Sequence, residues 1–143
     1  MADEARVFAE GVDNVIVRQV TVANGTAIAK GALLVFSGAS RVAVTHTVAG
    51  SADARPAGFA TSSKEASDGI TEIGVQRTGV VDAYTDGTTN AGCLIKVGAT
   101  TINHLEAADS VGAISYQLMT AILGRALEHG TDNQVRRVAL TLG

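Results

Sequence analysis

VTVANGTAIAKGALLV, residues 20–35, and VDAYTDGTTNAGCLIK, residues 81–96, are the two stretches that decide the fold of this chain. Each begins with a Val-containing segment, passes through an Asn-Gly or Asp-Gly turn and ends in an apolar run, which predicts strand, tight turn and strand. At an offset of 61 the matching pairs are Val20 and Val81, Gly31 and Gly92, Leu33 and Leu94, and Leu34 and Ile95.

A second pair of stretches follows in the same order. GFATSSKEASDGITEIGV, starting at Gly58, resembles GRALEHGTDNQVRRVALTL, starting at Gly124. Val, Gly and Ala are common here, so chance could explain single identities, but the order of elements is better evidence. We therefore predict a mainly β fold, a compact β-barrel or two-layer β-sandwich built from two similar meander halves, residues 15–78 and 79–143. Residues 1–14 have no helical or strand period and are expected to form an extended arm.

The remaining strands are predicted from β-branched or alternating apolar runs. They cover residues 14–22, 31–38, 41–48, 57–61, 70–84 with a break at Gly79, and 91–98. Helical spacing occurs only at residues 109–123, where Val111, Ile114, Leu118, Met119 and Ile122 follow a cap at Asp109 or Ser110. At most one short helix is expected, because Gly112 and Ile114 weaken this pattern.

Composition restricts the function classes. The 143 residues make one ordinary domain with a net charge of -3 and only three Lys. A surface poor in Lys fits packing against other proteins, or a Ser/Thr/Gly surface that needs few charges. Nucleic acid is not an expected partner, because basic clusters and stacking rings are missing. No apolar run could span a membrane and no leader opens the chain, so we expect synthesis in the cytoplasm.

No catalytic or phosphate-binding sequence motif is present. His46 lies in the apolar register of its strand, which favours a hydrogen-bonded, partly buried side chain over a ligand. His104 and Glu106 have the spacing of one strand face, and with Cys93 they could be imagined as a metal site, although Cys93 fits a small buried apolar residue better. We therefore expect no enzyme, no metal and no cofactor.

The polar group near the end of the chain is interpreted as surface of a turn. It consists of Arg125, Glu128, His129 and Asp132. Adjacent side chains such as Glu128 and His129 would diverge on a strand, which makes them a poor catalytic pair.

Three stretches together resemble the small capsid decoration, or cement, proteins of tailed bacteriophages. They are AIAKGALLVFSGASRVAVT, IGVQRTGVVDAYTDGTTNAGCLIKVG and ILGRALEHGTDNQVRRVALTLG. The family's ending maps onto Leu123, Gly124, Ala126, Leu127, Glu128, Val135, Val138 and Leu140, with Leu123 where the pattern often has Ile. Residues 99–120 fit the pattern least.

The resemblance implies a structural virion protein that binds the major capsid protein on the outer surface of an assembled head and stabilises it. It also implies a homotrimer at threefold or quasi-threefold positions. Arg6, Val7 and Phe8 in the arm are the candidate capsid contacts, with a frayed terminus as the alternative. A different class, a small β-barrel enzyme or ligand-binding domain using His46, His104 or the Glu128–His129 pair, stays open as the second hypothesis.

Overall fold

The computed structural model describes residues 6–7, 15–36, 42–46, 55–98, 101–108, 122–132 and 134–142, and every regular element in them is a β-strand. The strands are β1 (Arg6–Val7), β2 (Val17–Val22), β3 (Leu33–Phe36), β4 (Val42–Thr45), β5 (Arg55–Ala60), β6 (Glu72–Gln76), β7 (Thr78–Asp86), β8 (Leu94–Val97), β9 (Leu105–Ala107), β10 (Ile122–Ala126) and β11 (Gln134–Thr141). Among these residues there is no helix of the length and apolarity that a membrane crossing needs.

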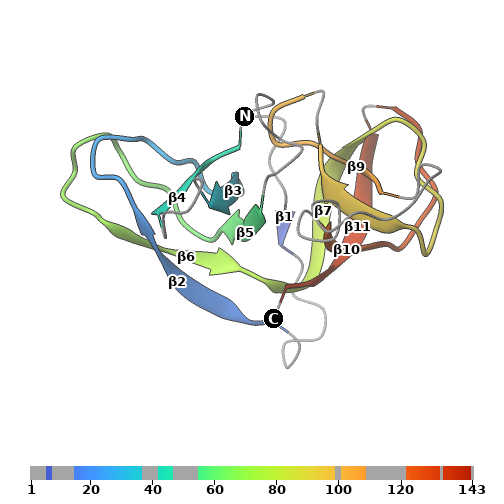
Figure 1. Ribbon diagram of the computed structural model, residues 1–143, viewed down its shortest axis with the longest axis horizontal. Helices are drawn as coiled ribbons and strands as arrows, with labels where there is room; N and C mark the ends of the chain where they lie inside the picture. The colour runs from blue at the N-terminus through green and yellow to red at the C-terminus, as the bar shows by residue number, and fades with distance from the viewer. Residues whose placement is uncertain are drawn as a thin grey trace.

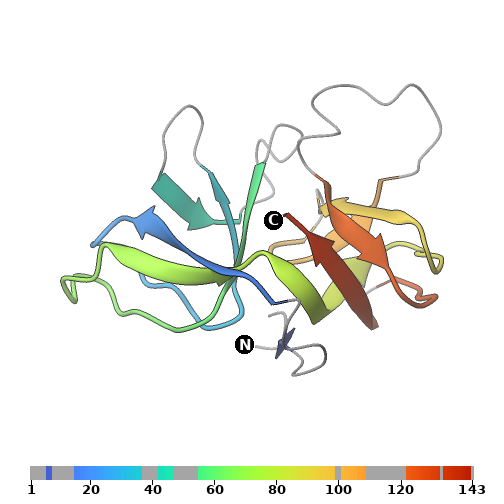
Figure 2. The ribbon, with the colours of Figure 1, turned by 90° about the horizontal axis from the view of Figure 1, so that it is seen from below.

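The strands form two barrels that lie side by side (Figure 1). The N-terminal barrel closes in the order β2-β4-β3-β5-β6. The C-terminal barrel runs β7-β11-β10-β8-β9 and is closed by pairing of β7 with β9, while β1 adds a sixth strand to β7. Seen from below, the chain passes from β6 of the first barrel to β7 of the second in the middle of the molecule, between the two barrels (Figure 2). The predicted β-barrel class is confirmed.

Both barrels have the same topology, which confirms the two similar halves. Each contains one parallel pair, β2 with β4 and β7 with β9, and four antiparallel pairs in the same cyclic order. An isolated bridge also recurs, between Ile28 and Lys64 in the first barrel and between Thr89 and Gly130 in the second. The halves therefore correspond in their loops as well as in their strands.

The structure explains why glycine occupies the same two positions in both halves of the repeat. Gly31 and Gly92 adopt φ of 88° and 87°, a region that favours glycine, and their N–H groups donate to Ala60 and Ala126 over 2.8 and 2.7 Å. Gly124 lies so close to the neighbouring strand that a Cβ there would stand 1.8 Å from the carbonyl oxygen of Ala139. A Cβ added at Gly58, the counterpart of Gly124 in the repeat, would stand 2.5 Å from the carbonyl oxygen of Gln76. The first pair thus lies where the backbone conformation favours glycine, and the second where a Cβ would clash with the neighbouring strand.

Apolar side chains fill each barrel and then continue across the boundary between the two. The first cluster lies inside the N-terminal barrel and contains Val20, Val22, Ile28, Ala32, Leu34, Ala43, Ala57, Ala60, Ile73 and Val75. The second lies inside the C-terminal barrel but also includes Leu33, Val35 and Phe59 from the outer face of the N-terminal barrel. Leu33 and Phe59 have no exposed surface at all. Because β3 buries both of its faces, its sequence is a continuous apolar run.

The corresponding outer face of the C-terminal barrel differs in sequence. In the repeat, Leu94 corresponds to Leu33, Lys96 to Val35 and Arg125 to Phe59. Lys96 is half-buried and paired with Glu106, and Arg125 is exposed. One outer face is therefore built for contact with the other barrel, whereas its counterpart carries charged residues.

The connection between the barrels is one residue, Arg77, and it is hydrogen-bonded to both of them. Its N–H donates to Ile16 (2.9 Å), and its carbonyl accepts from Leu142 (3.0 Å) at the end of the C-terminal barrel. Its guanidinium donates to the carbonyl of Ala57 over 2.8 Å. Burial, and to a smaller extent the charge of Arg18, lowers the pKa of Arg77 from its ordinary value.

Two boundaries differ from prediction. The break expected at Gly79 lies at Arg77 instead, and Gly79 sits inside β7 with φ of 101°. The expected helix at residues 109–123 falls mostly outside the described residues, and its last two positions, Ile122 and Leu123, belong to β10. Gly79 imitated a strand end because glycine is the usual turn residue.

We predict that Phe59→Ala lowers the free energy of unfolding by about 3–5 kcal/mol, because it opens a cavity between the barrels. Arg125→Ala, at the corresponding exposed position, should cost less than about 1 kcal/mol. Urea unfolding followed by circular dichroism measures both values. Equal losses for the two variants would contradict the assignment of Phe59 to a buried boundary.

Candidate functional site

His46 lies at the boundary of the two barrels, not in a ligand site. It follows β4 in the N-terminal barrel and is 1% exposed. Its Nδ1 accepts the N–H of Asn103 over 2.9 Å, so the ring proton is on Nε2, which donates to the carbonyl of Gly98 over 2.9 Å. Both partners belong to the C-terminal barrel, and the Asn103 side chain in turn accepts the N–H of Leu33. The predicted hydrogen-bonded histidine is confirmed, and it joins the barrels.

His104 is a second buried histidine close to the same boundary. Its Nδ1 lies 2.7 Å from Oδ1 of Asp86, and its ring stacks on Tyr84 with centroids 5.2 Å apart. An imidazole oriented by a carboxylate is half of a catalytic arrangement. Here, however, the ring is only 2% exposed, so a substrate has no access to it. The pair fixes the start of β9 against β7.

The imagined metal ligands do not come together. Glu106 forms an ion pair with Lys96, and His104 is engaged by Asp86. Cys93 packs against the apolar core of the C-terminal barrel. Within the part of the chain that the structure describes, no group of three or more His, Cys, Asp and Glu side chains could hold a metal ion.

The polar group near the end of the chain closes turns of the C-terminal barrel, as predicted. Its side chains are exposed and reach four different partners across neighbouring turns. Arg125 donates to the carbonyl of Gly92, Glu128 accepts the N–H of Arg137, His129 contacts Asn90, and Asp132 accepts the N–H of Gly87. Because each side chain has its own partner, Glu128 and His129 do not form a catalytic pair.

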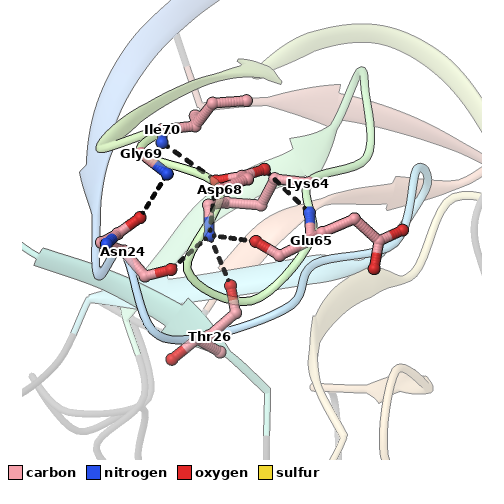
Figure 3. Close-up of polar contacts among 7 residues, drawn as sticks. All are labelled: Asn24, Thr26, Lys64, Glu65, Asp68, Gly69 and Ile70. Atoms are coloured by element: carbon pink, nitrogen blue, oxygen red, sulfur yellow. Dashed lines mark hydrogen bonds and ion pairs between the residues drawn. The ribbon is translucent and has the colours of Figure 1, made fainter.

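A lysine buried in the loops at the far end of the N-terminal barrel was not recognised from the sequence (Figure 3). The side chain of Lys64 has no exposed surface, and its ammonium group donates to the carbonyls of Asn24, Thr26 and Glu65 over 2.9, 2.7 and 3.0 Å. Asp68 lies 3.5 Å away and balances the charge. This ammonium ties the loop after β2 to the loop after β5.

Asp68 organises the second of these loops. Its carboxylate accepts the N–H groups of Ile70 and Glu65, each over 2.9 Å (Figure 3). The hydrogen bond from Ile70 is the largest cause that lowers the pKa of Asp68. Asn24 accepts the N–H of Gly69 over 2.7 Å and closes the pair of loops. The arrangement is a rigid loop end, and in the C-terminal barrel Gly130 takes the place of the lysine.

The candidate capsid contacts fall on β1 and just after it. Arg6 pairs with Asp82 and Val7 pairs with Val81, antiparallel to β7. Phe8 lies outside the described residues. Part of the predicted arm is therefore a strand, while the contact with a capsid stays a prediction.

The fold has a counterpart among phage proteins. It is similar to the N base of head fiber gp8.5 in bacteriophage phi29, with a TM-score of 0.53 over 90% of this chain and 96% of that one. The two sequences are 11% identical, so the similarity is one of fold. No protein-family profile and no curated protein matches the sequence.

We predict that the free energy of unfolding decreases as the pH falls through about 6.5, the ordinary pKa of histidine. Burial is the largest cause that lowers the pKa of His46, so the unfolded chain takes up a proton at a pH where the folded chain does not. Above that pH both states are neutral and the effect vanishes. His46→Gln should therefore make the free energy of unfolding depend less on pH between about 7.5 and 5, the range over which a histidine in the unfolded chain takes up its proton. Parallel curves for the variant and the parent protein would contradict the role of His46.

Replacing the buried lysine should loosen one end of the molecule. Lys64→Met keeps the side-chain length but removes the ammonium that donates to the three carbonyls, of which that of Asn24 still accepts from Ser67, and we expect a loss of about 1–3 kcal/mol in unfolding free energy. Hydrogen exchange should also become faster at the amides of Ser67 and Gly69, which donate to Asn24. Lys30→Met, at an exposed position of the same barrel, is the control. Equal behaviour of the two variants would contradict the role of the Lys64 ammonium.

Proposed function

We propose that this chain is a structural protein of a bacteriophage particle that binds the outer surface of an assembled head and stabilises it. The observation that carries the proposal is the two-barrel fold, which it shares over nearly the whole of both chains with the base of a phage head fiber. The resemblance to decoration proteins rests on the sequence and not on the fold comparison, and it supports the same class of protein. Its location would be the virion, after synthesis in the host cytoplasm.

The architecture suits attachment to a shell. The two barrels share one continuous apolar cluster and hydrogen bonds at Arg77 and His46, which favours a rigid body. A rigid body loses little conformational entropy on binding. Modest contacts then suffice, because affinity grows when many copies occupy repeated sites on one shell.

The partners in this proposal are the major capsid protein and further copies of the chain. A homotrimer fits threefold or quasi-threefold positions, where three equal neighbours meet. The arm, residues 1–14, would supply capsid contacts through Arg6, Val7 and Phe8. The proposal includes neither nucleic acid nor a membrane as a partner, and the sequence has no cluster of Lys and Arg of the kind that phosphate binding needs.

The second hypothesis, an enzyme or ligand-binding barrel, has less support. His46 and His104 are buried and hydrogen-bonded, and Glu128 and His129 serve separate turns. A catalytic site needs titratable groups gathered where a substrate can reach them. The described candidates are instead spread over the boundary and the loop ends.

We predict stoichiometric co-sedimentation of the purified chain with DNA-filled, expanded heads of the phage that encodes it, and a trimeric mass either free or bound. Deleting residues 2–13 should weaken head binding at least about tenfold, equivalent to about 1.4 kcal/mol. Deleting only residues 2–5 keeps β1 and is the matched control. Unchanged binding after the longer deletion would remove the arm from the interface, and no binding by the intact chain would refute the proposed function.

A further inference from the structure

The turn at residues 101–104 of the C-terminal barrel is connected to the N-terminal barrel through His46. Asn103 in this turn donates its N–H to Nδ1 of His46 over 2.9 Å, and its side-chain oxygen accepts the N–H of Leu33 over 3.2 Å. Nε2 of His46 donates to the carbonyl of Gly98, which precedes the turn, over 2.9 Å. Each of these hydrogen bonds passes from one barrel to the other, and His46 makes two of them.

The turn also has contacts of its own that do not involve the N-terminal barrel. The N–H of His104 donates to the carbonyl of Thr101 over 3.2 Å, and the carbonyl of His104 accepts the N–H of Gly98 over 2.9 Å. Asp86 on β7 holds the ring of His104. Because these contacts lie within the C-terminal barrel, the turn keeps its shape when its bonds to the other barrel are lost.

The two ring nitrogens of His46 respond differently to a proton. In the neutral ring Nδ1 accepts and Nε2 donates. Protonation places a hydrogen on Nδ1, where it faces the N–H of Asn103, and two donors cannot form a hydrogen bond with each other. Nε2 donates in both states, so its bond to Gly98 remains. The proton therefore breaks the contact with the turn and leaves the contact that precedes it.

The surroundings of His46 oppose a charge on the ring while the turn is attached. The side chain is buried, and burial is the largest cause that lowers its pKa. Among the described residues, two other titratable groups act on it: the charge of His104 lowers the pKa of His46, and the charge of Asp86 raises it. Detachment of the turn opens the ring to water, which brings the pKa back toward its ordinary value of about 6.5.

The sign of this linkage favours detachment in acid. The detached state has the higher pKa, so it takes up the proton first as the pH falls below about 6.5. Attachment is fully favoured above that pH. Below it the equilibrium shifts toward detachment by at most about tenfold per pH unit, until the attached ring is protonated as well. Opening of one turn exposes less surface than unfolding of a barrel, so it needs less free energy and occurs first.

We propose that His46 and residues 101–104 form a pH-sensitive connection between the barrels: when His46 takes up a proton, the turn detaches from the N-terminal barrel while both barrels stay folded. The apolar cluster and the hydrogen bonds of Arg77 remain in the detached state. The boundary therefore loosens at His46 and not at Arg77. The inference does not depend on attachment to a phage head, so the purified chain is sufficient for its test.

Hydrogen exchange of single amides, followed by NMR and corrected for the intrinsic effect of pH on exchange, tests the proposal. The amides of Leu33 and Asn103 report on the connection. Those of Gly31 and Gly92, which donate within their own barrels, report on the folding of each barrel. Between about pH 7.5 and 5 we expect opening at Leu33 and Asn103 to increase at least about threefold, with little change at the two glycines.

Two variants identify the group that takes up the proton. His46→Gln keeps an acceptor and a donor but does not titrate, so it should abolish the increase at Leu33 and Asn103. His104→Gln is the matched control, because this second buried ring contacts Asp86 within its own barrel, and it should retain the increase. In the unsubstituted protein, the ring resonances of His46 should titrate over the same pH range as the opening.

Three outcomes would overturn the proposal. An increase that persists in His46→Gln would assign the proton to another group. An equal increase at Gly31 and Gly92 would show unfolding of the barrels in place of a local detachment. Opening at Leu33 and Asn103 that does not depend on pH would show that the connection does not respond to protonation. None of these outcomes bears on binding to heads, so the proposed function stands or falls separately.

Discussion

Burial of Leu33, Val35 and Phe59 against the C-terminal barrel is the constraint on which the rest of the structure depends. These side chains point out of their own barrel, so without the second barrel they would expose a large apolar surface. Their burial fixes the relative orientation of the barrels. The hydrogen bonds of His46 and Arg77 then follow from that orientation, because each joins groups that only this arrangement brings together.

The same constraint explains how two halves of one fold came to differ in sequence. Positions that face the partner barrel in the first half are apolar, whereas their counterparts in the second half include Lys96 and Arg125. The loop ends differ as well, with a buried Lys64 in one and Gly130 in the other. The common topology is retained through backbone requirements, seen at Gly31 and Gly92, and not through the surface.

Features set by local sequence could be predicted. The strands from β2 to β8 follow from alternation and turn residues, and the repeat followed from the order of those elements. The surface character of Glu128 and His129 was also readable, because polar turn residues have a local pattern. The break at Arg77 was not, since a long arginine that reaches Ala57 and Leu142 resembles any strand residue in sequence.

Features set by contacts between distant residues could not be predicted. Alternation placed His46 in an apolar register but could not name Gly98 and Asn103 as its partners, more than fifty positions away. The burial of Lys64 could not be predicted, because three backbone carbonyls arranged around one ammonium leave no mark on the sequence. Pairing of β1 with β7 was invisible for the same reason.

The proposed attachment to a phage head is a separate matter from the fold, which the chain shares with a phage head fiber base. The most direct test is a cryo-electron microscopy reconstruction of heads saturated with the chain. The account predicts density for two adjacent barrels on the outer surface at threefold or quasi-threefold positions. A bare outer surface at saturating protein would contradict it.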